Sequence, residues 1–306
     1  RAQPRRPRRG ARGLRPMLGA SRPRWNREGR DWPNRAASRT LRAEGVEWHV
    51  QIMGEGPALL LLHGAGAATH SWAGLLPLLA EDHRVIAPDL PGHGFTSQPP
   101  GRGMSLPGMS WRIAGLLDAL GAAPALAVGH SAGAAVLARM ALDGRIAPAR
   151  IVALNGALTP FRGLAGTLFP GMARMLHWNP LAAPALSTAA IDPNAVPLLL
   201  RSTGSRVPAQ IAGAYARLLR CPGHVAGTLA MMAYWDLETL ERELPVLLVP
   251  LTLISADGDR AVPPGETAAL AARVADAELV SLPGLGHLAH EEDPGACAAA
   301  IRAAAA

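Results

Sequence analysis

The sequence predicts an α/β fold: a mostly parallel, doubly wound sheet with a helical cap inserted between two of its strands. Three observations lead to this expectation. From Val46 onward, short apolar runs alternate with segments of helical length, the pattern of a parallel sheet covered on both faces. The alternation stops over residues 157–243 and then resumes. A Gly-x-Ser-x-Gly pentapeptide, Gly129–Gly133, stands at one strand-to-helix junction.

The expected strands are continuous apolar runs, because a strand buried on both faces does not alternate with polar residues. They are Ala58–Leu62, Val85–Pro88, Ala125–Val128, Ile151–Leu154, Leu251–Ile254 and Glu278–Leu282.

Four helices are expected beside these strands. In the first, Ser110 acts as the N-cap, an apolar stripe follows at helical spacing, and Gly121 ends the helix. The others are Ala132–Leu142, Glu266–Val274 and Pro294–Ala304. Core segments 45–156 and 244–306 therefore flank an insertion.

The insertion, residues 157–243, contains prolines and several aromatic and methionine residues, Trp178 and Trp235 among them. We expect helices and loops that form a cap over a site. An ordinary helical core would have the same composition, and the two interpretations are compatible because the inner face of a cap both packs and lines a pocket.

The positive charge lies at one end of the chain. The net charge is +7 and all 30 basic residues are Arg, but residues 1–42 hold 14 of them against two acids. The remainder holds 16 Arg against 21 acids, so the body is mildly acidic and a nucleic-acid partner is not expected. Residues 1–23 are expected to be a disordered Arg/Pro-rich extension, with Met17 a plausible start, and residues 24–44 an Arg/Trp arm.

Other chemistry is not indicated. No apolar run approaches the roughly 20 residues of a membrane span, and the basic N-terminus lacks the apolar stretch of a signal peptide. Cys221 and Cys297 have no paired spacing, so neither a disulfide nor a zinc site is expected. His290, followed by two glutamates, is interpreted as a solvated helix start, and neither metal nor cofactor is predicted.

The pentapeptide Gly129-His130-Ser131-Ala132-Gly133 follows an apolar strand and precedes a helix of small residues. This is the context of a nucleophile elbow, where a serine on a strained turn leaves no room for side chains two positions away. The helix N-terminus favours negative charge beside Ser131. Ser131 is therefore the candidate nucleophile, with His130 supporting the turn.

A serine hydroxyl needs a base and an acid that orients the base. Downstream, Asp257 and Asp259 follow one predicted strand and His287 follows the next. Because parallel strands place their carboxyl ends at one edge of the sheet, we assign His287 as general base and Asp259 as its partner. Asp257 is the competing acid.

The loop His63-Gly64-Ala65-Gly66 follows the first buried strand, where oxyanion-hole donors are expected. The amide N–H groups of Ala65 and Ala132 are the predicted donors, and Gly64 lets the main chain approach a substrate. His63 is expected to brace the loop.

Several segments carry a resemblance to a known family. They are His63–Gly66, Asp89–Gly94, Gly129–Gly133, Asp259–Pro263 and Gly286–His287. In this order they resemble the α/β-hydrolase superfamily over roughly residues 45–305. The resemblance implies that the acid precedes the Arg-Ala-Val-Pro segment, which favours Asp259, and that Asp89–Gly94 is a structural turn in which His93 has no catalytic role.

A narrower resemblance begins in the arm. Trp25–Arg35, Ser38-Arg39, Glu47–Gln51 and His63–Trp72 are similar to the magnesium-chelatase accessory proteins of bacteriochlorophyll synthesis in phototrophic bacteria. This resemblance implies a role near magnesium insertion into protoporphyrin. Taken alone, the arm would pack its tryptophans on the domain or contact an acidic partner through arginine.

Two classes of function follow. The first is a cytoplasmic serine hydrolase that cleaves an ester or amide in tetrapyrrole metabolism. The second is a non-catalytic accessory protein that holds porphyrin or contacts magnesium chelatase; a general carboxylesterase is a further alternative. Dehalogenase and epoxide hydrolase chemistry is disfavoured because those relatives place Asp where Ser131 stands. Association with the photosynthetic membrane stays open.

Overall fold

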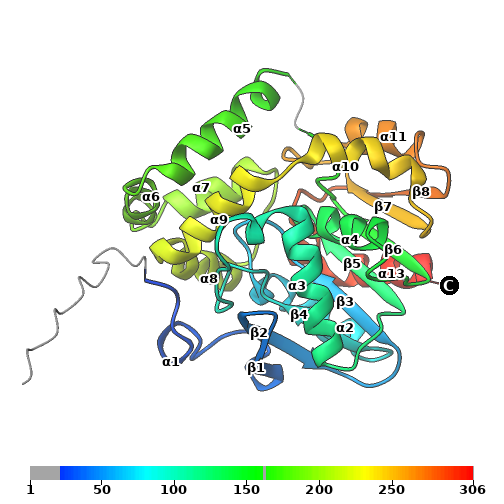
Figure 1. Ribbon diagram of the computed structural model, residues 1–306, viewed down its shortest axis with the longest axis horizontal. Coiled ribbons are helices and arrows are strands. Elements are labelled where there is room, and N and C mark those ends of the chain that lie inside the picture. The colour runs from blue at the N-terminus through cyan, green and yellow to red at the C-terminus, as the bar shows by residue number, and fades with distance from the viewer. Residues whose placement is uncertain (1–20, 161–162, 306) are drawn as a thin grey trace, which may run out of the picture.

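The computed structural model describes residues 21–160 and 163–305 (Figure 1). The side chains of residues 163–170 are outside the description. The extension predicted over residues 1–23 also lies outside it, apart from residues 21–23.

An eight-stranded, mostly parallel sheet forms the centre of the molecule, as predicted, in the order β1-β2-β4-β3-β5-β6-β7-β8. Strands β3 to β8 run parallel, while β2 is antiparallel to both β1 and β4. The strands are β1 (Ser38–Ala43), β2 (Val46–Met53), β3 (Ala58–Leu62), β4 (Arg84–Pro88), β5 (Leu126–His130), β6 (Arg150–Leu154), β7 (Leu251–Ala256) and β8 (Ala277–Leu282). The six predicted strands are confirmed, with ends that move by one or two residues.

Both faces of the sheet are covered by helices. In β3, Leu60 and Leu62 pack into one core and Leu59 and Leu61 into the other, which explains the uninterrupted apolar sequence. Helices α3 (Leu106–Ala119) and α4 (Ala132–Leu142) cover the first face, and α2 (Leu75–Leu79) and α13 (Pro294–Ala305) cover the second. The edge that bears the site therefore belongs to a sheet that is packed on both faces.

The helices of this framework are α1 (Trp25–Glu28), α2 (Leu75–Leu79), α3 (Leu106–Ala119), α4 (Ala132–Leu142), α11 (Pro264–Ala271), α12 (Ala289–Glu292) and α13 (Pro294–Ala305). Short 3₁₀ helices span Arg35–Ala37, Thr69–Trp72, Gly101–Met104 and Leu244–Val246.

The predicted start of α3 was wrong. The helix begins at Leu106, and Ser105 caps it by accepting a 3.2 Å hydrogen bond from the amide of Gly108. Ser110 lies inside the helix, is buried, and donates to Asp143. Pro107 and Gly108 stand in the first turn and are poor helix formers, which is why the sequence placed the start later, although proline is well tolerated at a helix start.

Six helices lie between β6 and β7; α5 to α9 extend outward from the sheet on the left of Figure 1, whereas α10 lies beside α4. They are α5 (Gly163–Trp178), α6 (Ala182–Ala189), α7 (Ala195–Ser202), α8 (Ala209–Leu219), α9 (Pro222–Tyr234) and α10 (Leu237–Glu243).

The N-terminal arm is part of the domain rather than an appendage. Residues 38–43, placed in the arm by the sequence, form the edge strand β1. Trp32 is 2% exposed, donates from Nε1 to Thr69 Oγ1 at 2.9 Å, and packs against Ala214 and Leu218 of α8. The arm thereby joins the first strands to the inserted helices.

Candidate active site

Polar residues follow the carboxyl ends of neighbouring parallel strands, at one edge of the sheet. His63 follows β3, Ser131 follows β5, Asn155 follows β6, Asp259 lies beyond β7 and His287 beyond β8. This edge is where open α/β sheets place their sites.

Ser131 occupies a strained turn between β5 and α4. Its φ of 50° and ψ of −116° are rarely adopted by a residue with a side chain. A Cβ on Gly129 would lie 2.5 Å from the amide nitrogen of Ala134, and one on Gly133 would lie 2.0 Å from the Leu62 carbonyl oxygen. Glycine is therefore required on both sides of the turn, as the pentapeptide indicated.

His287 and Asp259 are in direct contact. His287 Nδ1 lies 2.8 Å from Asp259 Oδ2, and the carboxylate side chain is fully buried. The other oxygen, Oδ1, accepts hydrogen bonds from the amides of Ala261 and Val262 at 2.7 and 2.8 Å. These bonds fix the carboxylate so that it holds the imidazole in one orientation.

Asp257, the competing acid, is directed elsewhere. It is exposed, and its Oδ1 accepts a 2.7 Å hydrogen bond from the amide of Gly284. Asp257 is therefore an ordinary loop residue, and Asp259 is the aspartate that contacts His287.

The loop after β3 lies against the serine turn. A Cβ on Gly64 would lie 2.8 Å from His130 Nδ1 and 3.1 Å from Ser131 Cβ, so only glycine permits this approach. His63 is fully buried; its Nδ1 lies 2.8 Å from the Gly64 carbonyl oxygen, and its Nε2 accepts from the Leu90 amide at 2.8 Å. His63 braces the loop and does not line the cavity described below.

His130 contacts the loop of residues 284–290, which carries His287 and is called the histidine loop below, and it is shielded from solvent. Its Nε2 lies 2.9 Å from the His287 carbonyl oxygen and its ring centroid 4.8 Å from that of His287. Burial lowers the pKa of His130 well below 6.5, so the ring is neutral and Nε2 carries the proton that this bond needs.

Asn155 was missed by the sequence reasoning. It is 1% exposed and hydrogen-bonds to Ala256, the last residue of β7 ahead of Asp259, and to the loop that carries His287. A polar residue directly after the buried strand Ile151–Leu154, followed by Gly156, is the signal that could have identified it.

The inserted helices also hold these loops. The carbonyl oxygen of Thr203 accepts from the amide of Arg260 at 3.1 Å and from that of His287 at 3.4 Å. Ser205 Oγ accepts from the Leu288 amide at 2.8 Å. The segment after α7 therefore fixes both the acid loop and the histidine loop.

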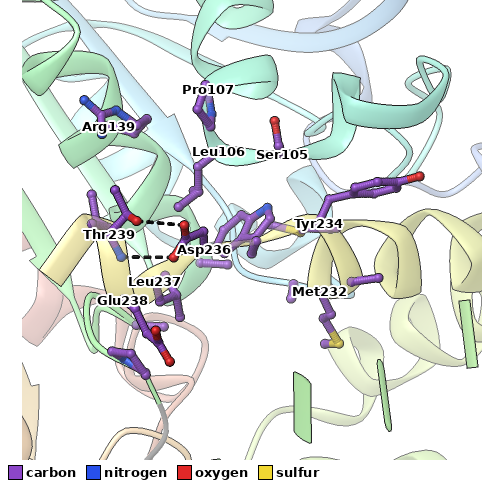
Figure 2. Close-up of a pocket in the computed structure, with 18 of the residues that line it drawn as sticks. Ser105, Leu106, Pro107, Arg139, Met232, Tyr234, Asp236, Leu237, Glu238 and Thr239 are labelled. Atoms are coloured by element: carbon purple, nitrogen blue, oxygen red, sulfur yellow. Dashed lines mark hydrogen bonds between the residues drawn. The ribbon is translucent and has the colours of Figure 1, made fainter. Parts of the chain in front are cut away.

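A cavity of about 770 Å³ opens over the serine turn, within the range of about 300–1,000 Å³ usual for small-molecule sites. Ala65, Ser131 and Ala132 lie in its wall. Figure 2 shows the start of α3, Ser105–Pro107, on one side and Met232–Thr239 on the other, with Thr239 donating twice to Asp236. Arg102, Arg174 and Trp178 also line this cavity.

His290 is not part of a solvated helix start, as the sequence had suggested. It is fully buried with Nε2 2.8 Å from Ser71 Oγ, and burial lowers its pKa to about 3. Glu291 is buried beside it, and desolvation raises the pKa of its carboxyl to about 8. Both side chains are buried because α12 packs against the rest of the domain. The local charge pattern of the sequence does not show this packing.

Residues 21–160 and 163–305 contain no group of three or more His, Cys, Asp or Glu side chains placed to hold a metal ion. Among the same residues, no helix is long and apolar enough to cross a bilayer.

Known proteins share this architecture. A solved structure of an α/β-hydrolase fold protein from Burkholderia ambifaria superposes with a TM-score of 0.73 at 24% identity, covering 87% of this chain and 97% of that one. A thermophilic esterase from Thermogutta terrifontis gives 0.70 at 22% identity, covering 87% and 97%. At these identities the likeness shows the fold alone.

Sequence comparison adds a family and a relative. The Rhodobacter capsulatus protein named magnesium-chelatase 30 kDa subunit is 40% identical over 263 residues, 85% of this chain and 92% of that protein. The family model described as alpha/beta hydrolase fold matches residues 57–294, which include all the site residues named above. The chain therefore belongs to the α/β-hydrolase fold family.

Proposed function

We propose that this protein is a serine hydrolase that cleaves an ester or amide bond and serves as an accessory factor of magnesium chelatase in bacteriochlorophyll biosynthesis. The observation that supports hydrolysis most directly is the 2.8 Å contact between His287 Nδ1 and the buried Asp259 carboxylate, in a site whose cavity is lined by Ser131. The 40% identical relative, named as a chelatase subunit, supports the pathway role.

In the proposed reaction, His287 Nε2 takes the proton of Ser131 Oγ as that oxygen bonds to the substrate carbonyl carbon. The carbonyl oxygen becomes an oxyanion, which the amides of Ala65 and Ala132 stabilise; Ala132 begins α4, so its N–H has no intrahelical partner. His287 then protonates the leaving alcohol or amine as its bond to the carbonyl carbon breaks. Water repeats the sequence and releases the acid from Ser131.

The cavity supports a large, mostly apolar substrate that bears carboxylates, as a tetrapyrrole does. Helices α5 to α10 act as a cap in this proposal, and the side chains of Trp178 and Trp235 form apolar parts of the cavity wall. Arg102 and Arg174 also line the cavity, and neither belongs to a salt bridge among the described residues. The Arg174 guanidinium donates from Nε to the Ala233 carbonyl oxygen at 3.5 Å, and guanidinium groups bind carboxylates well through their remaining N–H donors.

The same lining favours a second candidate, a non-catalytic protein that holds porphyrin for the chelatase. It requires the apolar walls and the two arginines but not Ser131. A cytoplasmic protein in contact with the chelatase fits both candidates, and a general carboxylesterase remains the simplest version of the first.

A fluorophosphonate probe tests the hydrolase proposal, since it bonds covalently only to an activated serine. Wild-type protein is expected to be labelled and the Ser131→Ala variant is not. The Ser105→Ala variant is the matched control, because Ser105 lines the same cavity but lies at the start of α3. Folded wild-type protein that resists the probe would exclude an active serine hydrolase.

The pathway role needs separate readouts. In cells that lack the gene, the Ser131→Ala variant should fail to restore bacteriochlorophyll if hydrolysis is the role, and full restoration would favour the holder. Protoporphyrin titration should quench tryptophan fluorescence saturably in the micromolar range, less so in Trp178→Phe and Trp235→Phe variants. Absence of saturable quenching would count against a porphyrin site.

A further inference from the structure

Asn155 stands directly after β6, which lies between β5, the strand that leads to Ser131, and β7, the strand that leads to Asp259. Its φ of 46° is in the left-handed region, which asparagine tolerates better than most residues. It is 1% exposed, and its amide N–H donates to the Ile254 carbonyl oxygen of β7 at 2.8 Å. A buried polar residue held in a strained conformation calls for a reason beyond packing.

The side-chain amide of Asn155 joins the loops of the acid and the base. Nδ2 donates to the carbonyl oxygens of Gly286 and His287 at 3.0 and 2.8 Å. Oδ1 accepts from the amide of Ala256 at 2.8 Å, three residues before Asp259. One rigid group thus sets the distance between the end of β7 and the backbone that carries His287.

The carbonyl oxygen of His287 receives a second donor, His130 Nε2, at 2.9 Å. His130 immediately precedes Ser131, so the backbone of the base is tied to the turn of the candidate nucleophile as well as to β6. The two donors occupy both lone pairs of this oxygen.

We infer that Asn155 is a positioning residue for the proposed hydrolysis: together with His130, it fixes the backbone of His287 relative to Ser131 and Asp259. The inference rests on the proposed function for its catalytic consequence. Asn155 acts through His287 and does not line the cavity. Displacement of a catalytic group by about 1 Å is enough to cost on the order of 100-fold in rate.

The chemistry of the contacts requires a carboxamide. The group must donate two hydrogen bonds and accept one, and asparagine provides both functions at this side-chain length. A carboxylate would direct negative oxygen at two carbonyl oxygens. The Asn155→Asp variant is therefore nearly isosteric but has the wrong bonding pattern, whereas Asn155→Gly removes the side chain and still permits the positive φ.

The test measures the rate of fluorophosphonate labelling and the kcat and KM for a p-nitrophenyl ester in full-length protein. Both variants are expected to be labelled at least 10-fold more slowly and to lose kcat more than they raise KM. For Asn155→Asp, the acidic limb of kcat/KM should also move to higher pH, because a carboxylate near His287 favours its protonated form. Asn194→Asp, an exposed change in the cap, should match wild type.

Circular dichroism and thermal midpoints show whether the variants are folded, and hydrogen exchange of residues 284–290 reports the histidine loop directly. Faster exchange in Asn155→Gly is expected whether or not the protein is a hydrolase. The inference would be overturned if Asn155→Gly is folded and has wild-type labelling and exchange. It would also be overturned if, in both variants, the loss of labelling rate and of kcat is no larger than the loss of folded protein. If wild-type protein is not labelled but the loop still loosens, the proposed function fails and the positioning role stands.

Discussion

The hydroxyl of Tyr215, on helix α8 of the inserted region, donates a 2.7 Å hydrogen bond to Oε1 of the buried Glu291 carboxyl group, four residues after His287. Ser71 Oγ donates to the same oxygen, and His290 lies beside it. Helix α12, which follows the loop that carries His287, is thus linked through one acid to α8 and to the 3₁₀ helix Thr69–Trp72.

This acid predicts a pH-dependent stability. Desolvation raises the pKa of Glu291 from 4.5 to about 8, so the folded protein binds a proton more tightly than the unfolded chain. The resulting stability is fully present below pH 4.5 and is lost as pH rises through 8, on the order of a few kcal/mol. Relative to Glu291→Gln, the wild-type free energy of unfolding should fall over this range in urea titrations.

The buried histidines contribute to both proteins, so their effects cancel in that difference. The nearest groups, Ser71, Tyr215, His290 and Glu292, are retained in the variant. A difference that stays constant from pH 4.5 to 9 would show that Glu291 titrates normally.

Replacement of Asp259 by asparagine should reduce kcat by about 10³–10⁴-fold with little change in KM. The amide would donate to His287 Nδ1 and so impose the wrong imidazole tautomer. Asp257→Asn is the matched control, since Asp257 is exposed and bonds Gly284, and its kcat should stay within a few-fold of wild type. Steady-state kinetics with a p-nitrophenyl ester measures both. Equal losses in the two variants would refute the assignment of the acid.

Gly133→Ala should destabilise the fold by about 1–3 kcal/mol, because the added Cβ would meet the Leu62 carbonyl oxygen, a backbone atom that cannot move alone. Gly213→Ala, in helix α8 with no heavy atom within 4 Å of the new Cβ, should be neutral or stabilising by up to about 1 kcal/mol. Urea midpoints give both values. A neutral Gly133→Ala would mean that the turn can relax away from β3.

Trp32→Ala should cost about 3–5 kcal/mol of stability, the usual effect of removing a fully buried tryptophan. The change also leaves Thr69 Oγ1 without its indole donor. Trp111→Ala, at a side chain that is 43% exposed, is the control and should have a much smaller effect in thermal unfolding. If Trp32→Ala lowers the free energy of unfolding only slightly, the arm contributes little to the packing of the domain.

The sequence determined the sheet because the composition of each strand shows whether its two faces are buried. Leu59–Leu62 alternate between two cores, and an uninterrupted apolar run is what such burial requires. It also determined the serine turn, since only glycine fits at positions 129 and 133, and it predicted that Asp259 and His287 would meet at one edge of the sheet. These features depend on short segments and on the geometry of parallel strands.

Only the tertiary structure decided the features that depend on contacts between distant segments. The role of Asn155 is one of them, because its side-chain amide joins residues 256, 286 and 287, which are distant from it in the sequence. His290 and its neighbouring glutamates looked solvated, yet packing of α12 against Ser71 and Tyr215 buries Glu291. Local sequence records propensity and periodicity, whereas desolvation and long-range hydrogen bonds arise only when the chain is folded.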